Sequence, residues 1–230
     1  SLSADTQGSL STAIGKSALE NQNFTTATNT FNVAVGAGAG EQVTTGQENT
    51  LIGGLAGDAL TAANYNVTVG YATLSADTLG SRSVAIGFEA LTTQNFTTAT
   101  NAYNVAIGFQ AGHDITTGQQ NTLVGNLAGD KLTDADYNVV VGLNALGTDT
   151  LGSRSTAIGY SALMTQNFTT ATNTDNTAVG YNAGTSITTG VINTLIGADA
   201  GDALTTGGYN VALGVNALTS DDVGTASVAI

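Results

Sequence analysis

The sequence lacks cysteine, proline and tryptophan, and it contains few charged residues and almost no basic ones. Without cysteine the chain can form neither a disulfide nor a thiolate site, so the redox compartment is left open. Seventeen acidic and four basic residues among 230 give a net charge of −13. This charge repels nucleic acid and anionic membranes, and no stretch of sequence is basic. The composition therefore predicts neither a nucleic-acid nor a membrane partner.

The groups that enzymes use for catalysis are equally scarce. His113 is the only histidine, and the repeat described below places Glu41 and Thr185 at its equivalent positions. The chain has no Ser/His/Asp set, no cysteine nucleophile and no phosphate-binding loop. We therefore expect a protein that is not an enzyme and that binds no cofactor.

What the sequence does contain is one short phrase, repeated. The phrase runs Asn/Ser, Thr/Val, a variable residue, Ile/Val/Leu, Gly, and its glycines lie 21, 17, 17 and 17 residues apart in a 72-residue super-repeat. The super-repeats cover approximately residues 11–82, 83–154 and 155–226, with a thirteenth phrase at Ser227–Ile230. Periodicity on this scale indicates a solenoid. We expect residues 1–230 to be one repetitive segment of a longer array.

The pattern within one unit, counted from its Asn/Ser as position 1, predicts short strands. Positions 2 and 4 are β-branched or leucine, so we expect them to share the face of a strand that points into the core. Position 3 is then expected to point outward, and a second short strand would fit positions 6–9. The sequence thus predicts an all-β fold, a parallel β-solenoid (β-roll) of about 13 coils with 17- and 21-residue rungs.

Two sets of residues are expected to hold the coils together. Glycine at position 5 suits a sharp corner, and asparagine at position 1 is expected to stack as an amide ladder. The corner glycines are Gly15, Gly36, Gly53, Gly70, Gly87, Gly108, Gly125, Gly142, Gly159, Gly180, Gly197 and Gly214, and the ladder includes Asn32, Asn104 and Asn176.

Three leucines stand at the position that is expected to face outward. Leu51, Leu123 and Leu195 occupy position 3 of the third unit in each super-repeat. A regularly spaced leucine opposite the core face is best explained by burial against another chain. We therefore expect these leucines to lie in the interface of a homo-oligomer, most plausibly a homotrimer. The alternative is a monomer whose connectors cover its second face.

The repeats resemble those of a known group of proteins. Asn176–Gly184 (NTAVGYNAG) and Ser83–Leu91 (SVAIGFEAL) look like the repeats of trimeric β-roll fibres. These include bacteriophage tail-fibre and appendage proteins and the head domains of bacterial trimeric autotransporter adhesins. The 17-residue unit with tyrosine after its glycine is closer to the phage type. The resemblance implies a homotrimeric segment of a virion fibre that spaces or contacts a host-surface glycan or protein receptor. The alternative is the head of an extracellular bacterial adhesin.

The longest identical segment is Gln-Asn-Phe-Thr-Thr-Ala-Thr-Asn, which occurs once in each 21-residue unit. It could present threonines to a glycan or a neighbouring chain, but we favour a structural bulge anchored by its phenylalanine. It also contains an Asn-Phe-Thr sequon, which we interpret as coincidence. The copies are Gln22–Asn29, Gln94–Asn101 and Gln166–Asn173.

Two further patterns have a binding interpretation and a simpler one. Asp58, Asp130 and Asp202 could supply oxygen ligands to Ca²⁺, but aspartate beside glycine is ordinary turn chemistry. We expect no metal site and keep these three as weak candidates. Pairs such as Thr44-Thr45 could order water or ice, but the glycine that follows them favours a turn.

Overall fold

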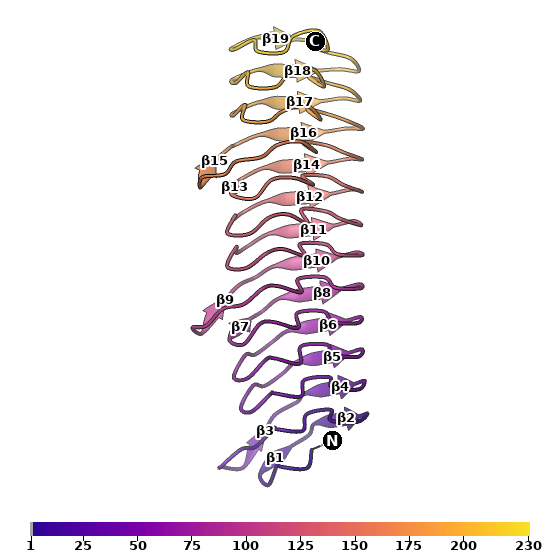
Figure 1. Cartoon of the computed structure of the whole chain (residues 1–230), viewed down its shortest axis with the longest axis vertical. Helices are drawn as coiled ribbons and strands as arrows, with labels where there is room; N and C mark the ends of the chain where they lie inside the picture. The colour runs from indigo at the N-terminus through magenta and orange to yellow at the C-terminus, as the bar shows by residue number, and fades with distance from the viewer. Residues whose placement is uncertain (1) are drawn as a thin grey trace. The chain divides into compact units, whose positions relative to one another are not determined.

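The computed structural model describes residues 2–230, which contain no helix and fold as a parallel β-solenoid of about 13 turns. Each turn contributes one short strand, which pairs in parallel with the strands of adjacent turns (Figure 1). The chain divides into two compact units, which we call unit 1 (Ser1–Thr117) and unit 2 (Gly118–Ile230). Their boundary lies inside the second super-repeat, so units and super-repeats do not coincide.

Unit 1 contains six strands of this kind, and each begins at position 2 of the repeat. Neighbouring strands are in register at matching repeat positions, so that Val33 pairs with Thr50 and Thr50 with Val67. The six strands, in spatial order, are β2 (Thr12–Ile14), β4 (Val33–Val35), β5 (Thr50–Ile52), β6 (Val67–Val69), β8 (Val84–Ile86) and β10 (Val105–Ile107).

Unit 2 repeats the arrangement with seven strands. Thr122 pairs with Val139 and Val139 with Thr156, again at equal repeat positions. The strands, in spatial order, are β11 (Thr122–Val124), β12 (Val139–Val141), β14 (Thr156–Ile158), β16 (Thr177–Val179), β17 (Thr194–Ile196), β18 (Val211–Leu213) and β19 (Val228–Ala229). The predicted all-β solenoid is confirmed.

The 21-residue turns add short two-stranded pairs beside these strands, as Figure 1 shows. They form where the four extra residues bulge out of the regular turn. The pairs are β1 (Gly8–Ser9) with β3 (Thr28–Asn29), β7 (Gly80–Ser81) with β9 (Thr100–Asn101), and β13 (Gly152–Ser153) with β15 (Thr172–Asn173).

A buried aspartate holds the extra segment in place in the second and third 21-residue units. Asp77 is fully buried, and its carboxylate accepts hydrogen bonds from Gly80 N at 2.9 Å, Phe96 N at 3.0 Å and Gln94 Nε2 at 2.6 Å. Burial raises the pKa of Asp77, and these three hydrogen bonds oppose that rise. Asp149 makes the same three contacts 72 residues later.

The assignment of the two strand faces from the sequence is wrong. Position 3 points into the core and is fully buried, as at Ala34, Leu51 and Ala85, whereas positions 2 and 4 are partly exposed. Leu51, Leu123 and Leu195 are each 0% exposed. They therefore do not lie on an outward interface, because their own solenoid already encloses them.

The size of position 9 explains why leucine fits inside. Where position 3 is leucine, position 9 of the same turn and of the preceding turn is glycine. Leu51 lies against Gly40 and Gly57, where an added Cβ would come within 2.6 Å and 2.9 Å of its methyl carbons. In turns where position 9 is leucine, position 3 is a smaller residue: alanine beside Leu19 and Leu91, threonine or valine beside Leu74 and Leu146. The two positions thus compete for the same limited volume in the core.

The segment after the corner glycine is a turn, and the predicted second strand at positions 6–9 is wrong. Positions 7 and 9 are left-handed, with φ of 57° at both Leu55 and Gly57, which a strand does not allow. The corner itself requires glycine. At Gly53 φ is +133°, and a Cβ there would lie 2.1 Å from the carbonyl oxygen of Gly70 in the next turn.

Asparagine at position 1 links successive turns. Asn32 Oδ1 accepts a hydrogen bond from Asn49 N at 2.9 Å, and Asn49 Oδ1 accepts one from Asn66 N at 3.0 Å. In unit 2, Asn176 Oδ1 accepts from Asn193 N at 2.9 Å. Each of these buried amides also donates to a carbonyl oxygen 14 residues ahead, as from Asn32 Nδ2 to Gly46 O at 2.7 Å. In the turn that follows each 21-residue unit, the asparagine Nδ2 also donates to a glutamine Oε1, as from Asn32 to Gln22 at 2.9 Å and from Asn104 to Gln94 at 2.8 Å.

Candidate subunit interface

One surface feature recurs in every turn: the side of the strands opposite the core, which we call the outer face. It consists of the side chains at positions 2 and 4, and in every turn these are threonine, valine, isoleucine or leucine. They remain partly exposed, with Ile52 38% exposed and Ile107 37% in unit 1, and Ile196 39% and Leu213 47% in unit 2. A largely apolar surface that carries no charge over so many turns is typical of a contact with another molecule.

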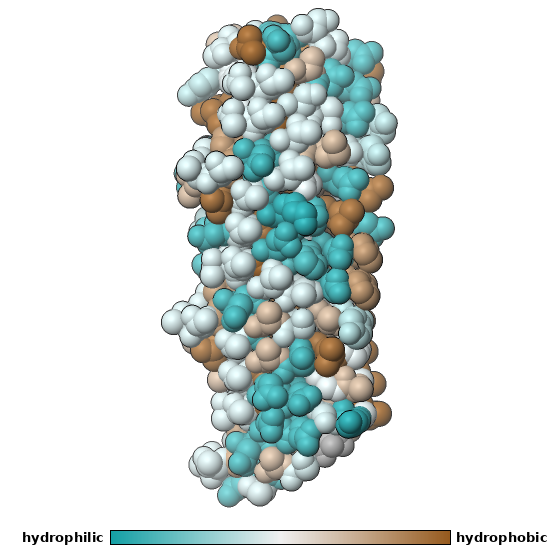
Figure 2. Space-filling view, in the orientation of Figure 1, coloured by the Kyte–Doolittle hydropathy of each residue, from teal (hydrophilic) through white to brown (hydrophobic). Residues whose placement is uncertain are grey.

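A second row of side chains, apolar in most turns, follows the corner glycine at position 6, and we call it the trailing row. In unit 1, Tyr71, Phe88 and Phe109 stack ring on ring, with centroids 5.7 Å and 5.5 Å apart. In unit 2, Tyr160 and Tyr181 stack at 5.2 Å. These rings are 43–54% exposed. Figure 2 shows apolar groups in brown along the side toward which the strand arrows of Figure 1 point.

A third row precedes the strands, at the residue before position 1, and we call it the leading row. Its members have left-handed backbones, with φ of 61° at Tyr65, 65° at Arg82 and 52° at Tyr103 in unit 1. In unit 2 the corresponding residues are Tyr137, Arg154 and Asp175. The outer face is thus bordered on both sides by rows of exposed, mostly large side chains.

The candidate aspartates lie on separate turns. Asp58 is in unit 1, and Asp130 and Asp202 lie four turns apart in unit 2. Burial raises the pKa of Asp58, and the Glu41 carboxylate of the preceding turn adds to the rise. Oδ1 of Asp58 and of Asp202 is buried without a hydrogen-bond partner. Among residues 2–230 no three acidic, histidine or cysteine side chains are grouped closely enough to hold a metal ion.

The repeated Gln-Asn-Phe-Thr-Thr-Ala-Thr-Asn segments are anchored by their phenylalanines. Phe24 and Phe96 are 5% exposed and Phe168 is 7% exposed, whereas the threonines that follow each of them are exposed. Thr28 Oγ1 donates to Thr26 O at 2.9 Å within the segment. The bulge is therefore packed at its base and polar at its tip.

The connector threonines are engaged within the solenoid. Thr44 Oγ1 donates to Thr61 O at 3.3 Å, and Thr61 Oγ1 donates to Thr78 O at 3.0 Å. In unit 2, Thr188 Oγ1 donates to Thr205 O at 3.2 Å. These hydroxyls link one turn to the next, which favours the turn interpretation over an ice-ordering surface.

His113 lies among carboxylates rather than beside a nucleophile. Its Nδ1 is 2.5 Å from Asp114 Oδ1, and its Nε2 is 3.8 Å from Glu89 Oε2. Glu89 Oε2 also accepts a hydrogen bond from Gln110 Nε2 at 2.8 Å. The histidine therefore takes part in a polar surface cluster.

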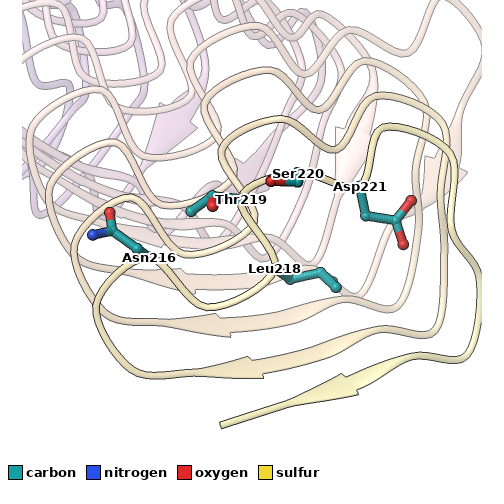
Figure 3. Close-up of a pocket in the computed structure, with 5 residues that line it drawn as sticks. All are labelled: Asn216, Leu218, Thr219, Ser220 and Asp221. Carbon is teal, nitrogen blue, oxygen red and sulfur yellow. The ribbon is translucent and has the colours of Figure 1, made fainter.

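One hollow lies in the last full turn of unit 2, lined by Asn216, Leu218, Thr219, Ser220 and Asp221 (Figure 3). Leu74 and Leu146, which occupy the position of Leu218 in other super-repeats, are fully buried because the next turn covers them. The hollow is thus the uncovered core of a terminal turn, and it gives no indication of a ligand.

Within residues 2–230, no helix is long and apolar enough to cross a membrane. The chain matches no protein-family model, no curated protein and no solved structure with which it was compared. The outer face and its two bordering rows are therefore the features from which a function can be inferred.

Proposed function

We propose that this chain is a shaft segment of a homotrimeric attachment fibre of the phage tail-fibre or appendage type, located on a virion. It spaces a host-binding element from its base and offers a surface to a host receptor. The observation that carries this proposal is the uncharged, partly exposed outer face, which is repeated in every turn of both units.

The repeat itself supports a second and third copy of the same chain as the partner. A partner that covers this face must present matching apolar groups once per turn, at the strand spacing of about 4.8 Å. A copy of the chain in parallel orientation meets that requirement automatically. The face also carries no charge in a chain of net charge −13, so copies can approach there with the least repulsion.

The energetics require many turns to act together. Full burial of a valine or isoleucine side chain contributes about 1.5–3 kcal/mol. The side chains here are already partly buried, so covering each of them with a partner would contribute roughly 1 kcal/mol more. Association costs about 4–15 kcal/mol in lost translation and rotation. A few turns would not overcome this cost, whereas an array does. The large number of turns thus both lengthens the fibre and stabilises the trimer.

The mass of the protein in solution tests this proposal. We expect sedimentation equilibrium at micromolar concentration to give three times the 22.8 kDa chain mass. A triple variant with Ile52→Asp, Ile107→Asp and Ile196→Asp should sediment as a monomer, because each substitution buries a carboxylate in the interface.

A matched control places the same charges where no contact is expected. Thr25→Asp, Thr97→Asp and Thr169→Asp lie on the exposed tips of the three bulges, and this variant should remain trimeric. Circular dichroism should show an intact β-structure in both variants. A wild-type chain that is monomeric at micromolar concentration would rule out the trimer.

A further inference from the structure

The leading row of unit 1 contains an arginine held between two tyrosines. Arg82 Cζ lies 4.7 Å from the ring centroid of Tyr65 and 5.8 Å from that of Tyr103, one turn to either side. All three side chains are exposed, with Tyr65 at 45% and Tyr103 at 50%. The guanidinium is therefore stacked between two rings at the surface of the solenoid.

The contacts of Arg82 orient its guanidinium and leave part of it open. Arg82 Nε donates to Asn101 Oδ1 at 3.1 Å. Within residues 2–230 no carboxylate forms an ion pair with Arg82, and its two Nη groups have no hydrogen-bond partner. Stacking by the rings and the Nε hydrogen bond together fix the plane of the group. The Nη donors are thus preorganised to receive a ligand.

The open edge of a fixed guanidinium suits a carboxylate. Its paired N–H groups match the two oxygens of a carboxylate in a bidentate geometry, and prior orientation reduces the entropy lost on binding. Tyrosine hydroxyls on the neighbouring turns can donate to and accept from sugar hydroxyls. The stack thus combines one charge contact with flanking contacts for a polyhydroxylated ligand.

The surrounding charge limits how many acidic groups that ligand can carry. Arg82 is one of four basic residues in a chain of net charge −13, and Glu48 stands in the same row two turns away. A polyanion, such as an acidic peptide, would meet repulsion from Glu48 and from the net negative charge of the chain beyond this single cation. A mostly neutral saccharide with one carboxylate would not.

We infer that the Tyr65–Arg82–Tyr103 stack is a binding site for a neutral oligosaccharide that carries a single carboxylated sugar. This inference rests on the proposed attachment function and identifies the chemical class of its receptor. It requires the stack to stay reachable in the trimer, so the trimeric sample itself is used to test it.

Unit 2 lacks this arrangement at the equivalent position. Arg154 and Tyr137 are present there, but Asp175 replaces Tyr103. No ring stacks on Arg154 within the described part of the chain. The second ring is missing, and an acidic residue stands one turn away. Arg154 of unit 2 is thus an internal control for the site at Arg82.

Isothermal titration with defined probes tests the inference. A trisaccharide of two neutral hexoses ending in glucuronate should bind saturably, with one site per chain. The same trisaccharide ending in glucose, sodium acetate alone and a penta-aspartate peptide should each bind at least tenfold more weakly. Equal binding of the neutral sugar or of acetate, tighter binding of the peptide, or no binding of the acidic trisaccharide would overturn the inference.

Variants then assign the site. Arg82→Gln should weaken binding at least tenfold, whereas Arg154→Gln should leave it unchanged. Tyr103→Asp should weaken it several-fold, and Asp175→Tyr should raise the stoichiometry from one site per chain to two. An unchanged affinity in Arg82→Gln would exclude this site. Sedimentation of the same samples separates the two proposals, since a trimer that does not bind refutes only the ligand site.

Discussion

Units 1 and 2 contain the same turns 72 residues apart, and the positions at which they differ distinguish structural from variable residues. Leu51 and Leu123 are equally buried, and Asp77 and Asp149 make the same three hydrogen bonds. By contrast, Tyr103 in the leading row becomes Asp175. The core volume and the buried polar contacts are thus retained where packing demands them, whereas exposed positions vary.

The largest effect is expected from emptying the core at equivalent leucines. Leu51→Ala and Leu123→Ala should each lower the free energy of unfolding by about 2–5 kcal/mol, because each leaves a cavity beside glycines that cannot fill it. Urea denaturation of each variant measures the loss, and the two values should agree. Little loss of stability combined with loss of association would instead place these leucines in an interface.

The next effect concerns the buried aspartates. Asp77→Asn and Asp149→Asn should each lower the free energy of unfolding by about 1–3 kcal/mol. In each variant an amide NH2 replaces the carboxylate oxygen that accepts from Gln94 or Gln166, so that two donors face each other. Gln94 cannot simply turn over, since its Oε1 accepts from Asn104. Thermal unfolding checks the cost, and unchanged midpoints would show that these contacts are dispensable.

A smaller change in stability, of opposite sign in the two units, is expected at position 3 in the fourth turn of a super-repeat. Thr68 is fully buried and its Oγ1 has no hydrogen-bond partner, whereas the equivalent residue in unit 2 is Val140. Thr68→Val should therefore stabilise unit 1 by about 1 kcal/mol, and Val140→Thr should destabilise unit 2 by a similar amount. Denaturation midpoints that shift in the same direction for both variants would contradict this account.

The smallest effect depends on pH. Because burial raises the pKa of Asp58, folding favours its protonated form. Its contribution to stability is full below the ordinary value of 3.8 and is lost as the pH rises through the folded pKa. Asp58→Asn should therefore raise the unfolding midpoint at pH 7 but not at pH 3. Asp130→Asn should show no such gain, because Lys131 Nζ lies 3.5 Å from the Asp130 carboxylate.

Much of the architecture could be predicted from the sequence. The spacing of the phrase glycines gave the turn length, and β-branched residues at positions 2 and 4 located the strands. The orientation of those strands was missed, because an alternating Thr-Ala-Ile pattern does not say which face is enclosed. One signal was available. Position 3 is leucine only where position 9 is glycine in both its own turn and the preceding one, and it is smaller wherever position 9 is leucine, which indicates that the two positions face each other inside the coil.

The bordering rows could not be predicted in the same way. That Tyr65, Arg82 and Tyr103 recur at one repeat position is visible in the sequence, but their stacking depends on left-handed backbones at all three residues. Those conformations are uncommon outside glycine. The residue types, tyrosine and arginine, do not predict a left-handed backbone.

By itself the sequence determined the period, the parallel ladder and the glycine corners, because each follows from steric limits that act within one turn or between identical neighbouring turns. Only the tertiary structure decided which face of each strand is enclosed and which is left for a partner. That choice depends on how the turn after the corner folds back over the strand, and so on which side chains share the limited volume inside the coil.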